Sequence, residues 1–304
     1  MYDDLTARIA HVLRPAELDR IQRHPAFADA ARQAAVLATV APDADPVLFG
    51  LFRDTGRFVS AMLALYLDAT GKLTHATLSR LVTDLGKAGF GRVSAMLLFM
   101  RSIGYIAPAP PTADQREKRF VPTPRMSDAV RRRFHREFAL AAPFHPACAQ
   151  AGPMLDTPEG FAAFCGAAGV VTQGAFRQPI EEPSLNVFSG RVGGMTMLAH
   201  MLLSVEGAGD FPRAGRVTVS LSALSRRCRV TRGQVGHVLK AAEAAGFMVR
   251  DDREWLLSDA LAAQVRLFTA VRVLLLAEMA DRVVSALPAL GASASPLAPE
   301  VPSR

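Results

Sequence analysis

The stretch from Gly215 to Met248 most constrains what this chain can fold into. It reads GRVTVSLSALSRRCRVTRGQVGHVLKAAEAAGFM. Ser220 stands where a helix N-cap is wanted, and Thr231 opens a capping-box pattern that is completed by Gln234. Gly246 is the residue type that commonly ends helices. The stretch therefore predicts a strand, a short helix, a sharp turn, a second helix and a glycine stop.

An earlier stretch, Gly71 to Ile106, follows the same plan. Self-similarity at a long period indicates duplicated structural units. The matching residues, identical or similar in type, pair 56–57 with 190–191, 62–64 with 197–199, 71–74 with 215–218, 78–81 with 221–224, 104–106 with 246–248 and 127–129 with 258–260. We therefore expect one chain to carry the helix-turn-helix unit twice.

Length and composition fit two domains. The chain has 304 residues, 50% hydrophobic and 21% charged, which is enough for two ordinary cores. The longest apolar runs, 58–67 and 271–276, are shorter than the roughly 20 residues that a membrane span needs. The amino terminus lacks the pattern of a signal peptide. We expect a cytoplasmic protein without a membrane partner.

Positive charge is concentrated on the two repeated stretches. The whole chain has a formal net charge of +7. Residues 215–250 and 71–106 together carry a larger excess of Lys and Arg over Asp and Glu than the whole chain does. Such charge on helix-turn-helix units indicates contact with nucleic-acid phosphates. The alternative is a solvated basic surface.

The second helix of the later unit has two distinct faces. Val235, Val238, Leu239 and Ala242 recur at helical spacing and are expected to face the core. Glycines and cations are left on the opposite face, as suits a helix pressed into a DNA groove. The alternative is that His237 is an ordinary exposed histidine. The predicted DNA contacts of this unit are Arg226, Arg227, Thr231, Arg232, Gln234, His237 and Lys240.

Each unit is followed by a predicted hairpin. Residues 247–250 and 254–257 form one, and residues 105–107 and 119–122 form the other, with a longer arm between them. The first arm carries the further candidate DNA contacts Arg116, Lys118 and Arg119. Such arms commonly contact phosphates or the minor groove.

The two units and the run from Arg116 to Met126 resemble winged helix-turn-helix regulators of the multiple-antibiotic-resistance (MarR) type. Members of that family usually end the wing in a Leu-Thr-Pro run, where this chain has Val121-Pro122-Thr123-Pro124. The resemblance covers roughly residues 47–137 and 188–284. It implies a mainly α fold with two winged-helix domains, each a three-helix core with a β-hairpin wing. The family's homodimers bind pseudo-palindromic DNA, so a tandem repeat resembles a fused dimer with pseudo-two-fold symmetry.

Domain boundaries follow from this interpretation. We expect an N-terminal winged-helix domain with leading helices at 1–140, a connecting segment at 141–186, and a C-terminal winged-helix domain at 187–287. The connecting segment includes a helix at 158–168, and the last domain ends in a long helix. The inward stripe of that helix is predicted to be Leu261, Val265, Phe268, Val271, Leu275 and Met279. Residues 288–304 are predicted to be a disordered tail. Terminal and linker helices join the two halves, with an external homodimer as the alternative.

The two units are not equal. In the first, Gly91, Ala95, Leu98 and Ser102 are expected on the outer face, with Arg92, Ser94 and Arg101 as its candidate DNA contacts. Leu98 stands where the second unit has Lys240, which suits a protein partner or a buried inter-domain surface better than DNA. The first copy is expected to contact DNA through its wing, and the second copy through the second helix of its helix-turn-helix. Alternatively, one copy has lost DNA contact.

Signals of enzymatic chemistry are poor. Residues 89–91 lack the remaining glycines of a phosphate loop, and the seven histidines have no metal-ligand spacing. The three cysteines include no close pair and are expected to be reduced, with a sensing thiol as the alternative. The cluster Arg131-Arg132-Arg133 with Arg136 is interpreted as a phosphate contact or as a solvated face. We predict no catalytic residue, no metal and no cofactor.

The function that the resemblance implies is sequence-specific binding of double-stranded DNA by a transcriptional regulator, nucleoid-associated when bound. One alternative is a protein-interaction module that kept the fold. The other is a regulator that senses an effector in a crevice between the halves, near Phe161, Phe164 and Cys165.

Overall fold

The computed structural model describes residues 2–39, 55–86, 89–110, 118–178, 185–206, 209–251 and 254–293. It is mainly helical, as the sequence predicts, with one two-stranded and one three-stranded antiparallel sheet. The first half contains α1 (Tyr2–Val12), α2 (Pro15–Gln22), α3 (Phe27–Thr39), α6 (Thr55–Ala69), α7 (His75–Asp84), α8 (Phe90–Ser102), β1 (Ile106–Pro108), β2 (Phe120–Pro122) and α9 (Pro124–Ala141).

The second half begins with α10 (Pro146–Met154), α11 (Pro158–Ala175), α12 (Asn186–Ser189) and α13 (Gly194–Ser204). It continues with β3 (Gly215–Val217), α14 (Leu221–Cys228), α15 (Arg232–Ala244), β4 (Met248–Asp251), β5 (Glu254–Leu257) and α16 (Asp259–Ser293). The order of strand, helix, helix and hairpin predicted for residues 215–257 is confirmed.

Local capping explains why α14 and α15 start and stop where they do. Ser220 caps α14 by accepting a hydrogen bond from the amide of Ala223, and Thr231 caps α15 by accepting one from the amide of Gln234. The latter is the threonine half of the predicted capping box. Between the helices, Arg229 adopts the left-handed region at φ 50° and makes the sharp turn. Gly246, at φ 72°, ends α15 as predicted.

The first unit repeats this geometry with one difference. Thr74 caps α7 in a full capping box with Thr77, and Gly104, at φ 72°, ends α8. The strand expected at residues 71–74 is reduced to a single antiparallel bridge between Thr74 and Arg119. The predicted hairpin is confirmed, with Ile106 opposite Pro122 and Pro108 opposite Phe120.

The helix that follows each wing starts with the same hydrogen bonds. The Thr123 hydroxyl donates to the carbonyl of Gly104 at 2.7 Å, and the Ser258 hydroxyl donates to the carbonyl of Gly246 at 2.8 Å. Thr123 is therefore the equivalent of Ser258, and the predicted pairing of residues 127–129 with 258–260 is wrong. The two hairpins differ in length, so an alignment based on identical residues paired Ser127, rather than Thr123, with Ser258.

The α7 and α14 helices also pair differently from the sequence match. The N-caps Thr74 and Ser220 are equivalent, so the buried Leu78 corresponds to Leu224, because each lies four residues after its cap. The predicted pairings of residues 71–74 with 215–218 and of residues 78–81 with 221–224 are therefore wrong as well.

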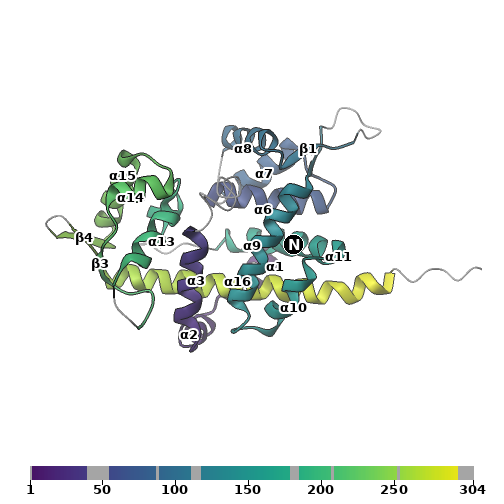
Figure 1. Ribbon diagram of the computed structural model, residues 1–304. Coiled ribbons are helices and arrows are strands. Elements are labelled where there is room, and N and C mark those ends of the chain that lie inside the picture. Colours follow the sequence, from purple (N-terminus) through teal and green to yellow (C-terminus); the bar gives the residue numbers. More distant parts are fainter. Residues whose placement is uncertain are drawn as a thin grey trace, which may run out of the picture.

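The helices that precede the two units are exchanged between them. Helix α3 precedes the first unit but packs on α13 of the second, and α11 precedes the second unit but packs on α6 of the first. The long α16 runs through the middle and contacts α2, α9, α10 and α11, with both units on the same side of it in Figure 1. The leading helices thus do not form a domain with the first unit alone.

The described helices of the predicted connecting segment, residues 141–186, are a large part of the core. The helix expected at 158–168 runs on to Ala175, and α10 lies beside it. The Gly and Ala content that indicated a linker is explained by close packing, because a Cβ at Gly169 would overlap the ring of Tyr66 on α6.

We expect Gly169→Ala to destabilise the fold by about 1–3 kcal/mol, the usual cost of overpacking a core. The measurement is urea denaturation of the full chain. Gly166→Ala is the matched control, because no heavy atom lies within 4 Å of a Cβ built at that position on the same helix. Equal effects of the two changes would contradict the close approach of α11 and α6.

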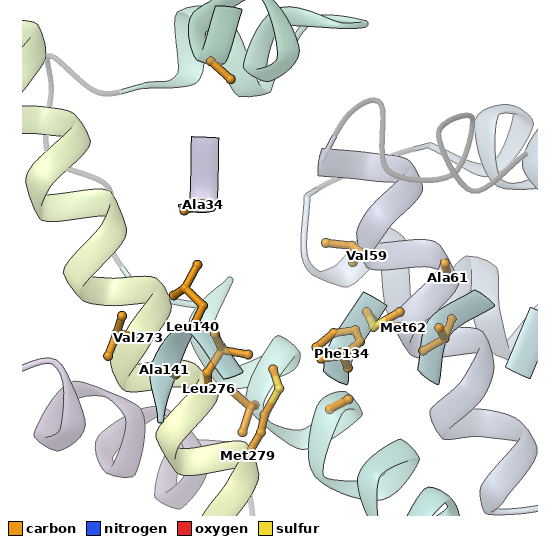
Figure 2. Packing of buried hydrophobic residues seen from close by; sticks show 14 of the residues in the cluster. Ala34, Val59, Ala61, Met62, Phe134, Leu140, Ala141, Val273, Leu276 and Met279 are labelled. Carbon is orange, nitrogen blue, oxygen red and sulfur yellow. The ribbon is translucent and has the colours of Figure 1, made fainter. Parts of the chain in front are cut away.

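One apolar cluster joins both halves. Figure 2 shows Ala34 of α3, Met62 of α6, Phe134 of α9 and Leu276 of α16 as parts of it. In the predicted inward stripe of α16, Leu261, Val265 and Met279 are buried, but Phe268 is exposed, which corrects that assignment. Val271 and Leu275 are half-buried. Because α16 extends to Ser293, the predicted tail is wrong for residues 288–293, and residues 294–304 lie outside the described part.

Helix α16 also bears on the expected absence of a membrane span. Residues 259–286 are long and apolar enough to cross a membrane by length and composition. Half of the most apolar window is buried inside the protein, and the helix carries Arg272 and Glu278 in ion pairs. The ion pair between Arg272 and Glu137 joins this helix to α9 within the described fold.

Candidate nucleic-acid interface

Helices α14 and α15 present a cationic surface. Arg226 and Arg227 are exposed in the last turn of α14, and Arg232, His237 and Lys240 are exposed on α15. Within the described ranges, none of the four Arg and Lys side chains forms an ion pair. This surface, which we call the α15 face, therefore carries positive charge without internal neutralisation.

The backbone of the α15 face is open to close approach. Val235, Val238, Leu239 and Ala242 are buried, which confirms the predicted inward side of the helix. A Cβ built at Gly236 would meet no heavy atom within 4 Å. Because no side chain projects there, a ligand can approach the backbone of α15 closely. A flat helix face flanked by cations suits insertion into a groove of a polyanion.

Two predicted contacts on this helix are tied to its start. The Thr231 hydroxyl accepts the amide of Gln234 at 3.1 Å, so it serves as the N-cap. Gln234 is half-buried beside it. These residues set where α15 begins, and with it the positions of Arg232 and His237.

The cations described in the second hairpin have partners within the protein. Arg216 on β3 pairs with Glu254 on β5 at 2.8 Å, and the Arg250 guanidinium lies 5.9 Å from the ring centroid of Trp255. Residues 252–253 at the tip lie outside the described part. The α15 face, rather than this wing, carries the unpaired cations of the unit.

The predicted contacts on α8 are arranged differently. Arg92 and Arg101 are exposed on its flanks. The Ser94 hydroxyl donates to the carbonyl of Phe90 at 2.9 Å and lies 2.7 Å from Nε2 of His75. Ser94 therefore holds α8 against α7, and its hydroxyl is already engaged within the protein.

In the described part of the first hairpin, the two predicted contacts have different environments. Lys118 is exposed, whereas Arg119 donates from its guanidinium to the carbonyl of Gly71 and so ties β2 to the turn before α7. Arg116 lies outside the described residues.

The arginine cluster on α9 is partly internal. Arg131 pairs with Asp128 at 3.0 Å and covers the Phe161 ring, and Arg133 pairs with Glu137 at 2.7 Å. Only Arg132 and Arg136 of this cluster are exposed. Neither proposed interpretation fits Arg131 and Arg133, because both side chains have partners inside the fold.

The crevice suggested as an effector site is packed. Phe161, Phe164 and Cys165 are buried, and the rings of Phe134 and Phe164 are 4.5 Å apart. Burial raises the pKa of Cys148 and of Cys165 to about 12, which keeps both thiols protonated and argues against a sensing role. Among the described residues, no group of three or more His, Cys, Asp or Glu side chains is placed to hold a metal ion.

A separate cavity of about 320 Å³ lies between α6, α8 and the loop before α13. Sequence reasoning missed it, because its walls come from distant segments. Its lining residues are Gly56, Arg57, Ser60, Arg92, Ala95, Met96, Phe99 and Val192. The cavity adjoins the outer face of α8.

No family model, curated protein or solved structure matches this chain. What the chain does must therefore be inferred from its own residues.

Proposed function

We propose that the chain is a sequence-specific, double-stranded DNA-binding transcriptional regulator that uses two winged-helix units as an intramolecular pseudo-dimer. The observation that carries the proposal is the α15 face, an exposed helix with cations at Arg232 and Lys240 and a low glycine surface between them. Phosphate neutralisation supplies most of the affinity of such a surface for DNA.

Each side chain of the α15 face has a role in this proposal. Arg226, Arg227 and Arg232 contact phosphates and fix the orientation of the helix. His237 and Lys240 point from the exposed side of α15 toward base edges, where a donor can select a purine acceptor. Lys118 of the first wing adds a phosphate contact.

The exchanged helices support the pseudo-dimer. Because α3 packs on α13 and α11 packs on α6 in a reciprocal way, each unit contributes a helix to the other, as two subunits of a dimer do. Both α8 and α15 lie on the same side of α16 in Figure 1, which lets one DNA duplex run past both. This proposal places the protein in the cytoplasm, on the nucleoid when bound.

Salt dependence tests the proposal. A DNA site is first selected from a random duplex library with the full chain, and its affinity is then measured by fluorescence anisotropy at several salt concentrations. If about four cations contact phosphates, log K should fall against log salt with a slope of about −3.6, or 0.9 per contact. An affinity that is independent of salt, or a selection that recovers no motif, would remove support for DNA as the ligand.

A second candidate function is a protein-interaction module, and one observation favours it for the first unit. Leu98 on α8 is 69% exposed. An apolar side chain of that size at the centre of a helix face is typical of a protein contact.

A further inference from the structure

A cleft of about 460 Å³ lies where α1 meets the C-terminal half of α16. It is lined by one arginine of α1 and by four residues of α16: Arg8, Asp281, Arg282, Ser285 and Ala286. The volume falls within the range of about 300–1,000 Å³ that is usual for small-molecule sites. Four of the five lining side chains carry polar groups, so the cleft suits a polar ligand rather than an apolar one.

Both arginines of the cleft are held by one buried carboxylate. Glu278 is 6% exposed, and its Oε1 accepts a hydrogen bond from Nε of Arg8 at 2.7 Å and from Nε of Arg282 at 2.8 Å. Two positive charges thus share one negative charge. Within the described ranges, neither arginine forms another hydrogen bond or ion pair. The Nε bonds fix both guanidinium groups, and the terminal amino groups remain as donors for a ligand.

The carboxylate of Asp281 supplies a negative charge to the same cleft. Among the described contacts, it forms no ion pair with Arg8 or Arg282. Its partner is His145, the N-cap of α10, whose Nε2 lies 3.6 Å from Oδ2, too far for a good hydrogen bond. The cleft therefore presents separated charges, with an excess of positive charge at the two arginines and a negative charge at Asp281.

We propose that this cleft binds a small zwitterion that carries both a carboxylate and an ammonium group, as a free amino acid does. We call it the α1–α16 site. The ligand carboxylate accepts hydrogen bonds from the terminal amino groups of Arg8 and Arg282, since guanidinium groups match carboxylates in geometry. The ammonium group donates to Asp281, and the Ser285 hydroxyl offers a further hydrogen bond.

The charge of Asp281 selects a zwitterion over a simple anion. A phosphate or a dicarboxylate would place a second negative charge close to this carboxylate, and like charges at short range repel. A ligand with an ammonium group instead meets a charge of opposite sign there. The proposal does not depend on DNA binding, because none of the residues proposed to contact DNA lines the cleft.

The probes are the standard L-amino acids, titrated one at a time into the full chain by isothermal titration calorimetry. The amino acid that binds most tightly is then compared with two analogues that have the same side chain. One analogue lacks the ammonium group, and the other lacks the carboxylate. Each analogue should bind about tenfold more weakly or worse, because it loses a charge-assisted hydrogen bond.

Replacing Arg8 with alanine tests the carboxylate contact. Arg8→Ala should weaken the selected amino acid by about tenfold or more, while Glu278 keeps its ion pair with Arg282. Arg20→Ala is the matched control, because Arg20 also pairs with a glutamate, Glu17, but does not line the cleft. It should leave the affinity unchanged. Circular dichroism should show both variants folded, since both arginines are exposed.

Replacing Asp281 with asparagine tests the ammonium contact. Asp281→Asn should weaken the amino acid by about tenfold or more. It should not weaken the analogue that lacks the ammonium group, because that analogue has nothing to donate to Asp281. This difference separates a lost contact from a general change in the shape of the cleft.

Three results would overturn the proposal. One is that no standard amino acid binds. Another is that the analogue without an ammonium group binds as tightly as the amino acid, which would make the cleft a site for simple carboxylates. The third is that Arg8→Ala and Arg20→Ala have equal effects, which would place the ligand elsewhere.

Discussion

Glu137→Ala should destabilise the protein by about 3–5 kcal/mol, the cost of removing one partner from a buried ion pair. The Glu137 carboxylate on α9 is 5% exposed and accepts hydrogen bonds from Arg272 of α16, one of them at 2.9 Å, and it also pairs with Arg133. Without it, two guanidinium groups face each other in a largely enclosed space. Denaturant unfolding of the full chain measures the loss.

Two variants serve as controls for this change. Glu159→Ala removes an exposed carboxylate at the start of α11 and should cost less than about 0.5 kcal/mol, as most surface substitutions do. Glu137→Gln keeps the shape and removes the charge, so it should retain part of the stability. If Glu137→Ala and Glu159→Ala unfold at the same denaturant concentration, the buried ion cluster contributes nothing.

The contribution of Glu137 should also depend on pH. Burial alone would raise the pKa of this carboxyl, but the charges of Arg272 and Arg133 and their hydrogen bonds outweigh burial and lower the pKa below its ordinary value of 4.5. A lowered folded-state pKa adds stability above pH 4.5 that is lost as the pH falls through the folded value. The difference in stability between wild type and Glu137→Gln should therefore shrink in acid, as seen in unfolding curves at neutral and low pH.

The same variant tests whether the two halves unfold together. The chain has one tryptophan, Trp255 on β5 of the second unit, whereas Glu137 lies on the helix after the first. If exchanged helices make one cooperative structure, Glu137→Ala should shift the fluorescence transition of Trp255 as much as the circular dichroism transition. A tryptophan transition that does not move would show that the second unit unfolds alone.

Local signals in the sequence were sufficient to predict the helices and strands of the second unit. Ser220, Thr231 and Gly246 act at short range, through caps and backbone angles, so their positions define α14 and α15 before any tertiary contact is known. The alignment of the two repeats was harder to predict. Thr123 and Ser258 make the same hydrogen bond, to the carbonyl of Gly104 and of Gly246, but they are different residue types.

Long-range packing was not readable from the sequence. A segment rich in Gly and Ala, such as α11, is equally typical of a linker and of a helix that packs closely on another helix. Only the contact of Gly169 with Tyr66 on α6 shows that α11 is the second kind. The same holds for side chains in the candidate site. Arg119 and Arg131 are residues of the type that contacts phosphates. In the structure, however, the Arg119 guanidinium donates to the carbonyl of Gly71, and the Arg131 guanidinium lies over the ring of Phe161. The exposed cations of α15 could be predicted because a helical period alone assigns their side of the helix.

Replacing both His237 and Lys240 with alanine should reduce affinity for the selected DNA site by roughly 100-fold, since each lost base contact costs about 1–3 kcal/mol. Binding to unrelated duplex should fall by less than about tenfold, because Arg226, Arg227 and Arg232 keep their phosphate contacts. The ratio of the two affinities, from anisotropy titrations at one salt concentration, is the measurement.

Arg23→Ala is the matched control for that double variant. Arg23 directly follows α2, and α2 lies on the other side of α16 from α15 in Figure 1. The side chain is an exposed cation paired with Asp19. Its loss should change neither affinity. Lys118→Ala should instead lower both affinities by a similar, smaller factor and reduce the salt slope by about one contact. A double variant that lowers both affinities equally would mean that His237 and Lys240 contact only phosphates, and base reading would then have to come from another surface than the α15 face.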